Sequence, residues 1–161
     1  VRATSFELGD VIDPGVLGDG LAPADRRKVQ IQGEVPGFRL QGDPEHLKAA
    51  LENLLVNAVR AGARRVIVRP SFDGGLKRAV IRVEDDGPGI PPEKVETMFH
   101  LEAGSARGGG HGLGLPLSKR LVEVLGGELR LASTSEEGAV FEIVVPGIHS
   151  RTSGPPRTEA G

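Results

Sequence analysis

The sequence contains no cysteine, no tryptophan and no tyrosine among its 161 residues. Without cysteine, a disulfide scaffold and a thiolate metal site are excluded, and a reducing, cytoplasmic setting is compatible with the chain. Its only aromatic residues are five phenylalanines, which argues against a stacking platform for single-stranded nucleic acid. The 20 basic and 22 acidic residues give a formal net charge of −2, so the charge balance predicts no nucleic-acid partner.

Long apolar runs are also missing. No stretch approaches the ~20 residues needed to cross a bilayer, and no signal-peptide core begins the chain. We therefore expect no membrane contact by this part of the protein. The length fits one domain that buries about two-thirds of its unfolded surface. Because Val1 is not an initiator methionine, we expect a piece of a longer protein, with a linker at 1–28, a compact domain at 29–147 and a disordered Ser/Gly/Pro-rich tail at 148–161.

Apolar periodicity and turn residues predict an α+β domain with its helices on one face of a sheet. Within residues 1–28 they predict only one weak helical segment. The expected helices span 43–61, 91–99 and 116–125, and the expected strands span 28–35, 66–68, 79–83, 128–132 and 139–145. Asp43 and Pro44 provide the cap and first turn of the first helix. The last two strands are expected to form a hairpin.

The helix at 43–61 carries a polar stripe beside its apolar face. Asn53 and Asn57 lie one turn apart and Arg60 follows one turn later. Carboxamide oxygens suit Mg²⁺, and an arginine can neutralise phosphate charge. A solvated helix face is the alternative, although two asparagines in mid-helix are unfavourable without some compensation.

Two glycine-rich segments follow. Asp85 to Ile90 reads Asp-Asp-Gly-Pro-Gly-Ile after a β-branched strand, which fits an ordinary turn. It also places a carboxylate where an exocyclic amine could donate to it. Gly110 to Leu115 reads Gly-His-Gly-Leu-Gly-Leu before Pro116, which predicts either a flexible surface loop or a phosphate-binding loop that opens a helix.

In this order, the three segments resemble the catalytic ATP-binding domain of two-component sensor histidine kinases, in the group that includes gyrase, the Hsp90 chaperones and the MutL proteins. Residues 51–58 match the Asn box, 85–90 the first glycine box and 110–115 the second, and the resemblance covers residues 6–146. It implies a Bergerat-type α/β sandwich that binds Mg²⁺ and ATP under a mobile lid. In that fold a mixed, mostly antiparallel sheet of about five strands is covered on one face by three helices.

The resemblance also implies residue roles. Asn57 would hold Mg²⁺, with Asn53 assisting near the phosphates as the second catalytic residue. Arg60 would contact phosphate, and Asp85 would accept a hydrogen bond from the adenine amino group. The remaining ATP-binding positions would be Gly87, Gly89, Ile90, Arg107, Gly110, His111, Gly112, Leu113, Gly114 and Leu115. Members that hydrolyse ATP carry a glutamate at the position of Asn53; a carboxamide is no general base, so phosphate transfer to a protein side chain fits better.

The sequence departs from the family pattern at several positions. Ala61 stands where many relatives carry an aromatic residue over adenine, and Gly138-Ala139 replaces the usual Gly-Thr. Met98-Phe99 matches half of the phenylalanine box, but its second phenylalanine is missing. The common lid lysine is also absent, with Arg107 as its possible substitute.

The phosphoacceptor and the partners are expected outside this stretch. None of the four histidines lies on a long dimerising helix with an acidic neighbour, as the phosphoacceptor of the family does, so the acceptor histidine would belong to a dimerisation domain upstream of Val1. A response regulator receiver domain would act downstream. Two alternatives stay open: a degenerate nucleotide-binding or docking module, and an anti-sigma-factor-type serine kinase of the same fold.

Overall fold

The computed structural model describes residues 5–35, 37–75, 77–99 and 111–147. Its main sheet has five strands in the order β2-β4-β5-β7-β6. Their bounds are β2 Val29–Ile31, β4 Val66–Asp73, β5 Arg78–Asp85, β6 Glu128–Ser135 and β7 Gly138–Pro146. The β2–β4 pair is parallel and the other three pairs are antiparallel. The predicted mixed, mostly antiparallel sheet is thus confirmed, as is the hairpin of β6 and β7.

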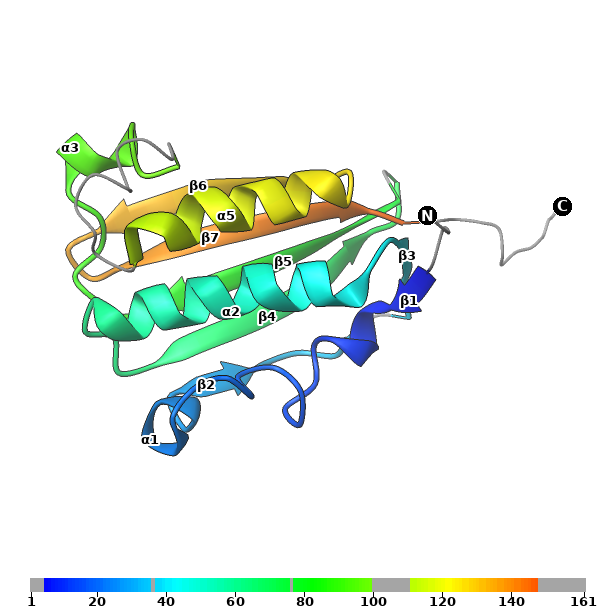
Figure 1. Ribbon diagram of the computed structural model, residues 1–161, viewed down its shortest axis with the longest axis horizontal. Coiled ribbons are helices and arrows are strands. Elements are labelled where there is room, and N and C mark those ends of the chain that lie inside the picture. Colours follow the sequence, from blue (N-terminus) through cyan, green and yellow to red (C-terminus); the bar gives the residue numbers. More distant parts are fainter. Residues whose placement is uncertain (1–4, 36, 76, 100–110, 148–161) are drawn as a thin grey trace, which may run out of the picture.

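Two long helices, α2 (Pro44–Arg60) and α5 (His111–Val124), lie side by side across one face of this sheet (Figure 1). The Asp43 side chain accepts a hydrogen bond from the Glu45 N–H at 2.9 Å, so it caps α2 as expected. At the other end, Gly62 adopts a φ of 106°, a conformation that suits glycine and stops the helix.

The core lies between this helical layer and the sheet. Helix α2 supplies a buried leucine face, and the strands supply the side chains that alternate inward. The largest fully buried side chains of α2, β4, β5 and β7 are Leu47, Leu51, Leu55, Val66, Val68, Ile81, Val83 and Ile143. The register brings Asp85 opposite Val66 on one side and Ala139 on the other. The last residue of β5 therefore lies between the first residue of β4 and the start of β7.

The N-terminal segment packs into the same core. Strand β1 (Ser5–Glu7) pairs antiparallel with β3 (Arg39–Gln41) in a separate two-stranded sheet, which the sequence patterns did not predict. A 3₁₀ turn (Leu8–Asp10) and the four-residue helix α1 (Pro23–Arg26) follow β1. The buried side chains of this segment are Phe6, Leu8, Val11, Ile12, Leu17 and Leu21. Residues 5–21 are thus part of the packed domain, whereas their connection to an upstream domain stays a prediction.

Two expected elements differ in the structure. The strand expected to reach Val35 ends at Ile31, shortly before Gly33 with its φ of 92°. In the segment expected as a helix over 91–99, only α3 (Pro92–Val95) is helical, and turns follow to Phe99. Its cap residue, Pro91, offers no side-chain hydrogen bond, and so short a helix gains little stability by itself. The tail at 148–161 lies outside the described residues.

The glycine run also differs from expectation. Helix α5 begins at His111, so the backbone of residues 111–115 is helical rather than a loop and Pro116 lies inside the helix. Proline lacks an N–H, so the Gly112 carbonyl has no helical donor at that position.

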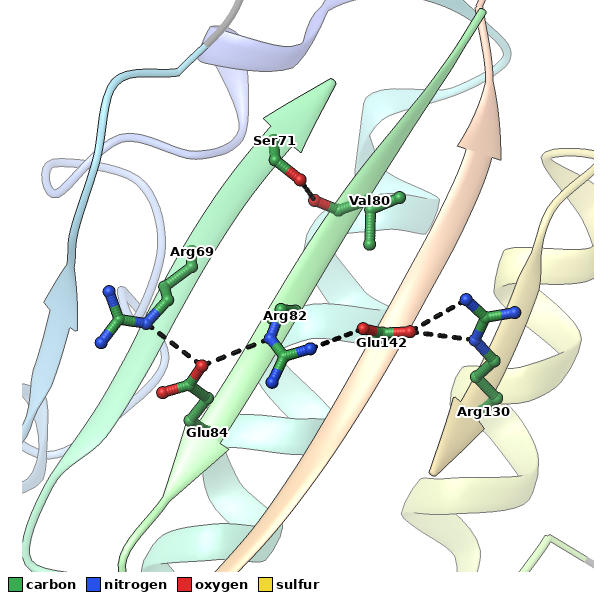
Figure 2. A network of polar contacts seen from close by, with 7 residues as sticks. All are labelled: Arg69, Ser71, Val80, Arg82, Glu84, Arg130 and Glu142. Carbon is green, nitrogen blue, oxygen red and sulfur yellow. Dashed lines mark hydrogen bonds and ion pairs between the residues drawn. The ribbon is translucent and has the colours of Figure 1, made fainter. Parts of the chain in front are cut away.

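The sheet face opposite the helices is polar and charged. Arg69, Arg82, Glu142 and Arg130 lie in register across four strands, and Glu84 joins their network (Figure 2). The Glu142 carboxylate accepts from Arg82 at 2.8 Å and from Arg130 at 3.0 Å. One apolar face and one charged face are typical of an antiparallel sheet covered on one side. In the described part of the chain, no helix is both long and apolar enough to span a membrane.

Candidate functional site

A pocket opens where the C-terminal end of α2 meets the end of β5 and the start of β7. The empty space in it amounts to about 360 Å³, including the part open to solvent. It is lined by Leu54, Asn57, Ala58, Ala61, Val83, Asp85, Gly89, Ile90, Ala139 and Phe141. Asn57 and Asp85 are the two polar side chains in an otherwise apolar wall. The pocket thus suits a flat apolar group with a polar edge.

Asp85 is the last residue of β5 and is half-buried. Burial raises the pKa of its carboxyl group above the ordinary value of 3.8; backbone hydrogen bonds from Gly87 and Ala139 partly oppose this increase, and the Asp86 charge adds to it. The Gly87 N–H donates to Asp85 Oδ1 at 2.8 Å. The ionised Asp85 carboxylate is therefore unfavourable in this setting unless hydrogen-bond donors stabilise its charge.

The turn after Asp85 needs glycine at Gly89. Its φ is 80°, and a β-carbon there would lie 1.8 Å from the Ser135 carbonyl oxygen. The next residue, Ile90, donates its N–H to Thr134 Oγ1 at 2.8 Å. The turn is thus pressed against β6 and bonded to it, which fixes the Ile90 side of the pocket.

Asp86 makes a different set of contacts, away from the pocket lining. Its exposed carboxylate accepts from the N–H groups of Arg64 at 2.8 Å and Arg65 at 3.0 Å. These hydrogen bonds hold the pKa of Asp86 below its ordinary value, and the one from Arg65 has the largest effect. The carboxylate therefore ties the end of β5 to the connection between α2 and β4.

The structure brings four of the predicted site residues together in the pocket: Asn57, Asp85, Gly89 and Ile90. Asn53 is half-buried one turn earlier on α2, and Arg60 is exposed as the last residue of that helix. Gly87 is buried, with the Ala63 backbone 3.5 Å from the position of an added β-carbon. None of these three residues lines the pocket.

The predicted phosphate-binding stretch forms the start of α5. The first four N–H groups of an α-helix have no partner within the helix, which here are those of His111, Gly112, Leu113 and Gly114. Such a helix end attracts anions. Leu115 is itself buried in the core. Arg107 and Gly110 lie outside the described residues.

The apolar wall was not predicted from the sequence. Leu54 and Ala58 come from α2, whereas Val83 and Phe141 are inward-facing residues of β5 and β7. The ring of Phe141 also meets Phe99 edge-to-face, with centroids 6.2 Å apart. The sequence signals for these residues were the helical periodicity of 43–61 and the strand alternation, which mark core positions without saying which of them border a pocket.

The pocket's oxygen donors suit Mg²⁺ that completes its shell with water and phosphate rather than with several protein ligands. In the parts of the chain that the structure describes, no three His, Asp or Glu side chains gather as a metal cluster. The pocket instead offers the carboxamide of Asn57. Mg²⁺ often binds through one or two protein oxygens and completes its shell with water and substrate phosphates.

Comparison with known proteins agrees with this arrangement. The family described as histidine kinase-, DNA gyrase B-, and HSP90-like ATPase matches residues 42–148. The chain is 38% identical over 121 residues to the sensor protein TorS of Escherichia coli strain K12. This match covers 74% of this chain and 13% of TorS. It therefore spans a small part of that curated relative.

Solved structures share the whole domain. The mycobacterial sensor histidine kinase MprB is 30% identical with a TM-score of 0.69, and the match covers 89% of this chain and 98% of that chain. The ATP-binding domain of PrrB from Mycobacterium tuberculosis is 22% identical with a TM-score of 0.71. That match covers 92% of this chain and 100% of that chain. The likeness to PrrB shows a common fold.

Proposed function

Because the chain belongs to the histidine kinase-, DNA gyrase B- and HSP90-like ATPase family, we propose that it binds Mg²⁺-ATP in the pocket between α2 and β5. We further propose that it donates the γ-phosphate to a histidine on the dimerisation domain of the same sensor kinase. The observation that carries this proposal is the pocket that joins Asn57 to Asp85 across an apolar wall.

Adenine would lie in the inner part of this pocket. The Asp85 carboxylate can accept a hydrogen bond from the exocyclic amine, and Gly87 already donates to one of its oxygens. Guanine presents a carbonyl oxygen at the same place, so acceptor would face acceptor. Asp85 would therefore select adenine, while Phe141, Val83 and Ile90 contact the ring.

The phosphates would extend from the pocket along α2 toward the start of α5. Asn57 would hold Mg²⁺ through its carboxamide oxygen, with Asn53 assisting and Arg60 contacting phosphate. The bound ion would neutralise phosphate charge during transfer. The N–H groups of the first turn of α5, His111 to Gly114, would provide neutral donors for the phosphate oxygens.

Transfer to a protein side chain fits this site better than hydrolysis. Asn53 cannot act as a general base. The neighbouring carboxylate, Glu52, accepts from the Gly18 N–H at 3.1 Å and lies 3.6 Å from the Lys48 ammonium group. It is therefore held against the N-terminal segment rather than in the pocket, where it could activate water.

The partners follow from the same proposal. The acceptor would be a histidine on the dimerisation domain of the parent protein, and a response regulator would take the phosphate from that histidine. TorS and MprB are named as sensor proteins or sensor histidine kinases, which favours histidine over serine as the acceptor. The domain would work on the cytoplasmic side of the cell.

The direct test supplies the missing acceptor. The chain is incubated with Mg²⁺ and γ-labelled ATP, with and without the helical dimerisation domain of the same protein. We expect an acid-labile, alkali-stable label on that domain and little phosphate release by the chain alone. Rapid multiple-turnover hydrolysis without the acceptor, or an acid-stable label on serine, would contradict the proposal.

A further inference from the structure

We propose that Asp86 is a positioning residue whose carboxylate clamps the end of β5 to the α2–β4 connection and thereby sets the width of the adenine pocket. The inference rests on the proposed function, because the quantity that it controls is nucleotide binding. It assigns a role to a side chain that does not line the pocket.

The clamp consists of hydrogen bonds between two segments more than twenty residues apart in sequence. Asp86 Oδ1 accepts from the Arg64 N–H at 2.8 Å and from the Arg65 N–H at 3.0 Å. The Asp86 N–H donates in return to the Arg65 carbonyl oxygen at 3.3 Å. One short side chain thus satisfies two backbone donors of a surface connection.

Both clamped segments lie next to residues of the pocket lining. Ala58 and Ala61 line it just before the α2–β4 connection, and Asp85 lines it just before Asp86. At Gly87 the segments are in contact, because an added β-carbon would lie 3.5 Å from the Ala63 nitrogen. A change in the spacing of Asp86 from Arg64 and Arg65 would therefore shift Asp85 relative to the end of α2.

The contact needs an acceptor oxygen, which a neutral side chain can also supply. Both backbone donors converge on the same oxygen, Oδ1, and an asparagine offers an equivalent oxygen at this position. Alanine offers none, and leaves the two N–H groups to water. Asp86→Asn should therefore preserve the clamp, whereas Asp86→Ala should release it.

The experiment compares both variants with Asp43→Ala. Asp43 also uses a carboxylate oxygen to bind a backbone N–H, that of Glu45 at 2.9 Å, but at the opposite end of α2. Mg²⁺-ATP affinity is measured by calorimetry, GTP affinity by competition, and folding by thermal melting. Amide hydrogen exchange of Arg64 and Arg65 is measured without nucleotide.

We expect Asp86→Ala to weaken ATP binding about fivefold or more and to reduce the preference for ATP over GTP. Asp86→Asn should stay within about twofold of the wild type, and Asp43→Ala should lower the melting temperature without changing affinity. Exchange at Arg64 and Arg65 should accelerate only in Asp86→Ala.

The inference is overturned if Asp86→Ala is folded and binds ATP as the wild type does, or if Asp86→Asn is as weak as Asp86→Ala. A wild-type chain that does not bind ATP contradicts the proposed function instead. In that case hydrogen exchange still decides on the clamp: unchanged exchange at Arg64 and Arg65 in Asp86→Ala rules it out.

Discussion

Two adjacent carboxyl groups at the end of β5 show how position determines chemistry at the scale of single residues. Burial raises the pKa of Asp85, whereas backbone N–H donors lower the pKa of Asp86. Asp86 is exposed and its hydrogen bonds stabilise its charge. Asp85 is half-buried in an apolar wall and becomes ionised at the expense of the free domain's stability.

Asp85→Asn should therefore make the free domain more stable at neutral pH. A carboxyl group whose folded-state pKa is raised contributes stability that is complete below its ordinary pKa of 3.8 and is lost as pH rises through the raised value. Asparagine keeps an oxygen for the Gly87 N–H and carries no charge. We expect the variant to melt at a higher temperature than the wild type at neutral pH, with the difference vanishing in acid.

The same substitution should reduce base selectivity, because the carboxamide can rotate to donate to guanine. Competition between ATP and GTP measures this, with thermal melts from neutral to acidic pH alongside. A variant that melts below the wild type at neutral pH would contradict the assigned pKa direction. An unchanged ATP-to-GTP ratio would contradict adenine recognition by Asp85.

At the scale of elements, local sequence signals predicted helix α2 closely. Asp43, Pro44 and Gly62 marked its ends, and it spans Pro44–Arg60. The hairpin of β6 and β7 also followed from turn residues and alternation. The three-residue strands β1 and β3 were missed, because so short a segment carries no periodic signal and forms only through its partner.

The site was predictable to a similar degree. Four residues that the Asn and glycine motifs singled out, Asn57, Asp85, Gly89 and Ile90, line one pocket in the structure, whereas their roles stay predictions. The apolar wall brings together residues far apart in sequence, such as Ala58 and Phe141. The bond from Ile90 to Thr134 likewise joins residues 44 positions apart. No local pattern encodes such contacts. The early start of α5 was likewise missed, since glycine and Pro116 both disfavour helix.

The charged row on the open face of the sheet provides a test at this scale. Glu142 joins Arg82 and Arg130, and its own side chain is only 12% exposed. We expect Glu142→Ala to lower the free energy of unfolding by about 1 kcal/mol or less, because the two arginines stay hydrated. Urea unfolding at low and high salt measures this, and the loss should shrink at high salt.

Glu128→Ala is the matched control, since Glu128 is exposed on the neighbouring strand β6. It should change stability by less than about 0.5 kcal/mol. An equal loss in both variants, or a loss at Glu142 that does not depend on salt, would show that the network is not electrostatic.

At the scale of the whole molecule, the N-terminal segment and the nucleotide-binding elements share one core. Leu8 is fully buried, at 0% exposure, although it lies in the segment that the sequence suggested as a linker. We expect Leu8→Ala to cost about 2–5 kcal/mol of stability while unfolding stays a single cooperative transition. Denaturant unfolding followed by two spectroscopic probes measures both properties.

Val124→Ala is the corresponding control, because that side chain on α5 is 59% exposed and its truncation should change stability by less than about 0.5 kcal/mol. If Leu8→Ala behaved like this control, or if a separate early transition appeared, the N-terminal segment would not belong to the cooperative core.

Calorimetric titration of ATP into the wild type and Asn57→Ala, each with and without Mg²⁺, tests most directly that this pocket binds Mg²⁺-ATP. We predict binding by the wild type that depends on Mg²⁺, and a loss of about tenfold or more in the variant, equal to ~1.4 kcal/mol. Its melting temperature should stay near that of the wild type, because Asn57 borders the core without filling it. Equal Mg²⁺-dependent affinity in a folded Asn57→Ala variant, or no binding by the wild type, would contradict the account.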